Sequence, residues 1–129
     1  MKRETERVLE DFSQAVSNLK EGLDKTVDDL DVDGSIKRFE LSYELAWKLI
    51  KAFLLETGIN CKNPRDCFKS AKANGLINDE LGWLRMIEDR NLLVHTYTML
   101  LSRQIFIKVR QEYFQLLNSL LIEILRIKQ

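Results

Sequence analysis

The chain has 129 residues, of which 45% are hydrophobic and 31% are charged. This balance is typical of a globular protein with enough apolar side chain for a buried core, so residues 1–129 are predicted to form a single domain. Twenty basic and twenty acidic residues leave no formal net charge. That excludes the broad positive field of non-specific nucleic-acid binders, and any contact with RNA must be local.

The sequence offers no membrane segment and no metal-binding pattern. Its first residues are charged, and no apolar run approaches the roughly 20 residues of a membrane span, so we expect a cytoplasmic protein. Cys61 and Cys67 are the only cysteines, and they lack both CxxC spacing and a secretory signal. Neither a zinc site nor a structural disulfide is therefore expected, and free, partly buried thiols are predicted. No metal and no cofactor is expected.

Five glycines and one proline are the only strong helix breakers, and apolar residues recur at helical spacing almost throughout. An all-α fold is therefore predicted. The first helix should run from about Glu4 to Val27, because one apolar stripe recurs there at steps of three and four residues. The acidic stretch Asp28–Gly34 is predicted to be a short loop, too irregular for an EF-hand calcium site.

Four further helices are predicted. Ser35–Glu56 has apolar residues on two sides, which is typical of a central helix, and its Trp47 is interpreted as a core or interface aromatic rather than a ligand platform. Asn63 and Pro64 mark the start of a third helix, which should end near Gly75. A fourth helix should begin with Asn78 as its N-cap, and the last should run from about Thr98 to Lys128. The last helix has enough apolar positions to face a partner as well as the core.

One stretch is the strongest candidate for chemistry, because it holds the only histidine together with an arginine, an asparagine and a tyrosine: Arg90, Asn91, His95 and Tyr97. Arg90 can bind a phosphate with two N–H groups and offset developing charge. The imidazole of His95 is a side chain that can take or deliver a proton in catalysis. Tyr97 can donate a hydrogen bond to phosphate or serve as a modifiable hydroxyl, while Asn91 can orient His95 or cap the backbone.

Helix geometry decides whether these side chains can meet. At about 100° per residue, Arg90 and Tyr97 fall on one side of the fourth helix, and His95 points about 140° away from Arg90. The three therefore converge only if the helix loosens near His95 or if a second subunit completes the site. Acid–base cleavage by two histidines requires a homodimer, since each chain has one histidine.

A structural interpretation of the same residues stays open. In it, Tyr97 packs its ring and leaves its hydroxyl at the surface, and His95 bonds a carbonyl at the helix end. Arg90 then pairs with one of its acidic neighbours, Glu88, Asp89 or Glu40.

Residues Arg90–Tyr97 form an intact R-x4-H-x-Y motif, which resembles that of the HEPN superfamily. The similarity extends to other segments, which together resemble the nucleotidyltransferase substrate-binding protein branch related to HepT-type toxins. These segments are Lys37–Lys48, Pro64–Asp66, Gly75–Ile77 and Trp83–Leu93. They occur in the same order between about residues 30 and 115.

The resemblance implies an up-and-down bundle of four to five helices, a homodimer, and a separate minimal nucleotidyltransferase as partner. In toxin members the paired motifs form a metal-independent ribonuclease site at the dimer cleft, which the partner silences by adding AMP to the motif tyrosine. Carried onto this chain, the resemblance implies that Arg90 and His95 are catalytic and that Tyr97 is the acceptor. We predict that Tyr97 and Asn91 are the modification or nucleotide-binding residues. The alternative function is a non-catalytic nucleotide- or substrate-binding subunit of a two-component nucleotidyltransferase. A purely structural helical adaptor is the third hypothesis.

Overall fold

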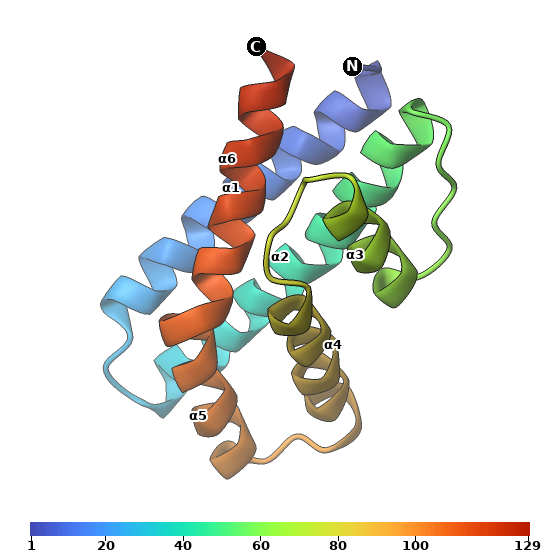
Figure 1. Ribbon diagram of the computed structural model, residues 1–129. Coiled ribbons are helices and arrows are strands. Elements are labelled where there is room, and N and C mark those ends of the chain that lie inside the picture. The colour runs from blue at the N-terminus through green and yellow to red at the C-terminus, as the bar shows by residue number, and fades with distance from the viewer.

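The computed structural model describes all 129 residues and contains only helices and their connections (Figure 1). The predicted all-α fold is confirmed. In chain order the elements are α1 (Arg3–Lys25), α2 (Asp29–Glu56), α3 (Pro64–Ala73), α4 (Glu80–His95), α5 (Met99–Lys108), the π-helical turn η1 (Val109–Tyr113) and α6 (Phe114–Lys128). No helix combines the length and the apolar character that crossing a membrane requires.

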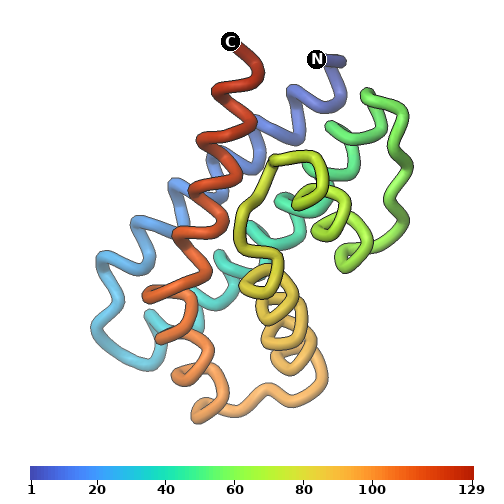
Figure 2. The backbone as a smooth tube through the Cα atoms, in the orientation of Figure 1, coloured from blue at the N-terminus to red at the C-terminus, as the bar shows by residue number.

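The central element is α2, as its two apolar sides predict. It contacts α1, α3, α5 and α6. The tube in Figure 2 shows α1 and α2 running in opposite directions, with α5, η1 and α6 forming one continuous column. Both chain termini lie at the end of the bundle where α2 finishes, since the Lys2 amide donates to Glu56 at 3.1 Å and Lys128 pairs with Glu6 at 3.8 Å.

The core is one cluster of 31 buried residues. Burial of this much apolar surface is the main force holding the helices together. Aromatic side chains fill its middle, and Phe68 packs on Trp83 with ring centroids 4.7 Å apart. Trp47 is half-buried and packs against the edge of this core, as predicted.

The prediction of an acidic loop over Asp28–Gly34 is wrong, because α2 already begins at Asp29. Asp28 is its N-cap, and its carboxylate accepts a hydrogen bond from the Asp31 amide at 2.9 Å. The Asp31 carboxylate in turn accepts a bond from the Val27 amide at 3.1 Å. This reciprocal capping satisfies free amides at the start of the helix, and the acidic side chains favour its positive end. The acidic residues therefore start the helix.

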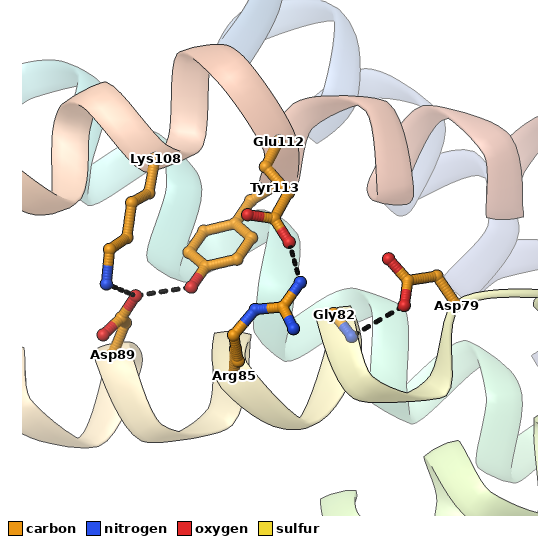
Figure 3. Close-up of polar contacts among 7 residues, drawn as sticks. All are labelled: Asp79, Gly82, Arg85, Asp89, Lys108, Glu112 and Tyr113. Carbon is orange, nitrogen blue, oxygen red and sulfur yellow. Dashed lines mark hydrogen bonds and ion pairs between the residues drawn. The ribbon is translucent and has the colours of Figure 1, made fainter.

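Side-chain caps also define where the other helices start. Asn63 caps α3 as predicted, and its side-chain oxygen accepts from the Asp66 amide at 2.9 Å. The predicted cap Asn78 is wrong by one residue, since Asp79 caps α4 by accepting from the Gly82 amide at 2.9 Å (Figure 3). Thr98 caps α5, so the predicted last helix begins where expected, although a π-helical turn interrupts it.

The prediction of free thiols is also wrong. Cys61 and Cys67 form a disulfide and are both buried. The cause lies in the helix that starts between them: the first turn of α3 carries Cys67 back over Cys61, with Cα atoms 5.0 Å apart. Sequence spacing alone does not reveal that approach.

Candidate functional site

Arg90 faces α2. Its guanidinium lies 5.7 Å from the centre of the Tyr43 ring, and one of its terminal nitrogens lies 4.0 Å from Glu44. None of the three carboxylates considered from the sequence pairs with it. Its bond to the Asn91 side chain is long, at 3.4 Å, and its Nε is buried without a partner. Leaving a buried donor unsatisfied costs about 1–3 kcal/mol. The terminal nitrogens of this half-buried guanidinium are held only by the 3.4 Å bond and the 4.0 Å ion pair, so they can receive an anion.

His95 is the last residue of α4, and its side chain is exposed. The helix is regular from Arg90 to His95, so the two side chains point about 140° apart. The imidazole forms no hydrogen bond and no ion pair within the chain, and the carbonyl contact of the structural interpretation is absent. Asn91 bonds Arg90 rather than His95. His95 therefore presents an unengaged imidazole to solvent.

Tyr97 lies in the connection between α4 and α5, and its side chain is about half exposed, at 51%. Its hydroxyl donates a hydrogen bond to Asp33 at 2.7 Å. Asp33 belongs to the first turns of α2, in the stretch predicted to be a loop. Burial, together with the carboxylate of Asp33, raises the pKa of Tyr97. The hydroxyl is therefore a neutral donor near neutral pH, with a proton acceptor already in place.

The contacts with α2 show how far apart the motif side chains lie. Tyr97 meets α2 at Asp33 and Arg90 meets it at Glu44. These two positions are eleven residues apart on one helix, or roughly 16 Å at 1.5 Å per residue. One chain thus does not bring Arg90, His95 and Tyr97 together, and their predicted convergence needs a second molecule.

A buried carboxylate fixes the orientation of α4 (Figure 3). Asp89 is 6% exposed. It accepts a hydrogen bond from the hydroxyl of Tyr113 in η1, and the amine of Lys108 lies 3.2 Å from the same oxygen. One turn earlier, Arg85 pairs with Glu112. Burial and the bond to Asp89 raise the pKa of Tyr113, which keeps the phenol protonated as a donor.

This network sets the position of the motif, because Arg90 follows Asp89 and projects about 100° further round the helix, toward α2. From the sequence, Asp89 was predicted only as a possible partner of Arg90, and its role in this network was missed. A signal was present: Asp89 lies three residues after Met86 and four before Leu93, which are both buried. A carboxylate within a buried apolar stripe requires a partner. The chain has no group of three or more His, Cys, Asp or Glu side chains placed to hold a metal ion.

Comparison with known proteins finds consistent relatives. A sequence model of the family "Nucleotidyltransferase substrate binding protein like" matches residues 7–126. The Haemophilus influenzae protein named "Probable ribonuclease HepT" is 30% identical over 105 residues, covering 78% of this chain and 70% of the relative.

Solved structures give the same picture of the fold. A crystal structure of a Thermus thermophilus protein is 31% identical, with a TM-score of 0.80, and the match covers 92% of this chain and 99% of that one. A Haemophilus influenzae structure, described as revealing the fold of a substrate binding domain of a nucleotidyltransferase, is 21% identical with a TM-score of 0.64. That match covers 97% of each chain. At that identity it shows the fold alone.

Proposed function

This chain belongs to the nucleotidyltransferase substrate binding protein-like family, in the HEPN and HepT-like branch, and on that premise we propose that it is a metal-independent ribonuclease that works beside a separate minimal nucleotidyltransferase. Residues 1–129 form one HEPN-like domain, and two copies pair so that two sets of Arg90 and His95 meet at the dimer cleft. The carrying observation is that both side chains hold hydrogen-bonding capacity that the chain itself does not use.

Cleavage follows from the side-chain chemistry. One His95 takes the proton from an RNA 2′-hydroxyl, whose oxygen attacks the adjacent phosphorus. The bond from phosphorus to the 5′-oxygen breaks, and His95 of the second copy protonates that leaving oxygen. Arg90 holds the phosphoryl oxygens and offsets their increasing charge. The products are a 2′,3′-cyclic phosphate and a 5′-hydroxyl.

Exposed apolar side chains in and after the Arg90–Tyr97 motif support dimerisation through this part of the surface. Four large aliphatic residues of α4 and α5 lie within the motif or after it in sequence and are 48–66% exposed: Leu92, Val94, Leu100 and Ile107. A group of exposed large apolar residues is typical of an interaction surface. In the proposed dimer this surface packs on its own copy and places the two His95 side chains across the cleft from each other.

Tyr97 is the proposed acceptor of AMP from the partner. Its oxygen attacks the α-phosphorus of ATP, pyrophosphate leaves, and Asp33 is placed to take the phenolic proton, since the hydroxyl already donates to it at 2.7 Å. The added phosphate brings negative charge to the face that must bind RNA. Modification therefore opposes RNA binding at the same face.

The test is cleavage of RNA by the purified protein in EDTA, compared with the His95→Ala variant. We expect fragments ending in cyclic phosphate with the wild type and none with the variant. Equal cleavage, or no cleavage by either protein, would refute the ribonuclease.

The second candidate function is a non-catalytic subunit that binds nucleotide or substrate for the nucleotidyltransferase. The family description and the lack of net charge favour it, because neutrality limits affinity for RNA. It predicts a stable complex with the nucleotidyltransferase when the two are co-expressed, unaffected by His95→Ala. Failure to co-purify would count against both functions.

A further inference from the structure

A depression of about 340 Å³ lies on the surface where three helices meet. Tyr43, Glu44 and Trp47 line it from α2, Arg65 lines it from the start of α3, and Arg90 lines it from α4. It therefore opens on the motif arginine, and the adjacent Asn91 also lines it. No role in the proposed cleavage is assigned to its other residues.

The charges in this depression favour an anion. Two guanidiniums, from Arg65 and Arg90, face one carboxylate, that of Glu44. The carboxylate is already engaged, since it accepts a hydrogen bond from the Trp47 indole at 3.1 Å and lies near Arg90. Arg65 forms no ion pair and no side-chain hydrogen bond within the chain, and the terminal nitrogens of Arg90 form only a 3.4 Å bond and a 4.0 Å ion pair. Two arginines with free donors suit a phosphate.

The position of Arg65 is fixed before any ligand arrives. The disulfide between Cys61 and Cys67 closes the segment that contains it. Within that segment Asn63 caps α3, and the Asp66 carboxylate accepts from the Lys62 amide at 3.0 Å. A cation held on a rigid backbone loses less freedom on binding than one on a flexible loop. The disulfide and these hydrogen bonds thus hold the backbone of Arg65 in place at the edge of the depression.

Aromatic surface lies beside the cations. The Trp47 indole is half-buried at the edge of the depression, and its bond to Glu44 fixes the ring. Lys51 lies 5.9 Å from the ring centre and adds a third positive charge nearby. A base next to a bound phosphate can stack on such a ring, which is how proteins hold single-stranded RNA without reading its sequence.

We propose that this depression is a nucleotide-binding subsite, in which Arg65 and Arg90 hold a phosphate and Trp47 packs against the adjoining base. The ligand is a nucleoside phosphate, either a nucleotide of single-stranded RNA next to the cleavage position or a free mononucleotide. This inference rests on the proposed function, because Arg90 belongs both to the proposed cleavage site and to this depression. On each copy, Arg90 then lies between the dimer cleft and the nucleotide-binding subsite. Trp47, interpreted from the sequence as a core or interface aromatic, also becomes a ligand contact.

The experiment measures binding separately from cleavage. A short fluorescein-labelled single-stranded RNA is titrated by anisotropy against the full chain carrying His95→Ala, so that the RNA stays intact, and AMP is titrated by tryptophan fluorescence as the second arm. Arg65→Ala should weaken RNA binding about tenfold and lower the slope of log affinity against log salt by about 0.7. Lys69→Ala, an exposed cation one turn further along α3 and outside the depression, should change neither. Arg65→Lys should recover only part of the affinity, because lysine keeps the positive charge but lacks the two parallel N–H donors of the guanidinium.

The outcomes separate the two proposals. If the wild type does not cleave RNA but Arg65→Ala still weakens binding, the ribonuclease fails and the subsite stands. If the wild type cleaves and Arg65→Ala binds RNA as Lys69→Ala does, the subsite is refuted alone. Binding of RNA but not AMP assigns the subsite to RNA, and binding of AMP alone assigns it to a mononucleotide. If the His95→Ala chain with Arg65 intact binds neither RNA nor AMP, the subsite is overturned.

Discussion

Tyr113→Phe should destabilise the protein by about 2 kcal/mol. The Tyr113 side chain is 0% exposed, and its hydroxyl donates to the buried carboxylate of Asp89. A hydrogen bond to a charged group contributes roughly 1.5–3 kcal/mol. Phenylalanine keeps the ring, so no cavity adds to the loss. Lys108 remains beside Asp89, which places the cost near the middle of that range.

Urea unfolding followed by circular dichroism measures this difference. The midpoint should fall while the m-value stays constant, and Tm should drop by roughly 6–10 °C. Tyr97→Phe is the matched control, since it also removes a phenol that donates to an aspartate, but at a half-exposed position. That variant should lose less than about 1 kcal/mol. Equal losses in the two variants would show that burial of Asp89 does not strengthen its bonds and would refute the reasoning.

Three further predictions concern stability. Replacing Cys61 and Cys67 by serine should cost about 2 kcal/mol, the loop-closure value for so short a ring, measured by urea unfolding with and without reductant. Burial raises the pKa of Tyr43 to about 12, above the value of about 10 in an unfolded chain. Because burial opposes ionisation of this phenol in the folded protein, the free energy of unfolding is unaffected by Tyr43 below about pH 10 and falls as pH rises from 10 through 12, which alkaline unfolding measures. Gly82→Ala should destabilise by about 1–3 kcal/mol, because the added methyl would lie 2.5 Å from the Asp79 carboxylate that caps α4 and 2.9 Å from the Leu116 side chain. Gly34→Ala should stabilise α2 by about 0.5–1 kcal/mol, because nothing lies within 4 Å of its added methyl; thermal melts compare the two.

Each of these has a result that contradicts it. The cysteine prediction fails if reductant lowers the Tm of the wild type and of the double serine variant by the same amount. Tyr43→Phe supplies the control for alkaline unfolding, and an unchanged profile in that variant would assign the transition to other groups. If both alanine variants shift Tm in the same direction, the close approach at Gly82 does not govern its response.

The sequence predicts the helices well where apolar periodicity or a proline start signals them, as at Asn63 and Pro64. The prediction from sequence is wrong at Asp28–Gly34, because a run of acidic residues is typical of a solvated loop, whereas here the run caps and begins α2. It failed again at Cys61 and Cys67, whose approach depends on the turn formed between them. Both errors concern local hydrogen bonding that periodicity does not encode.

At the candidate site, the sequence identifies side chains but not their neighbours. Helical projection correctly separates His95 from Arg90, since that depends only on one regular helix. The partners of Arg90 come from another helix, and the predicted ones were wrong because projection does not say which part of α2 lies opposite. The bonds from Tyr97 to Asp33 and from Tyr113 to Asp89 join residues 64 and 24 positions apart. Only the packed bundle brings them together.

The arrangement of the two chain ends has a practical consequence for tethering. Lys2 and Lys128 both meet the end of the bundle near Glu56, whereas Tyr97 meets Asp33 near the opposite end of α2. Glu56 and Asp33 are 23 residues apart on α2, or roughly 35 Å. A modifying enzyme fused to either terminus therefore needs a linker of at least about 10 extended residues to reach Tyr97 on the same molecule. With a shorter linker, modification would have to pass between molecules and would depend on protein concentration.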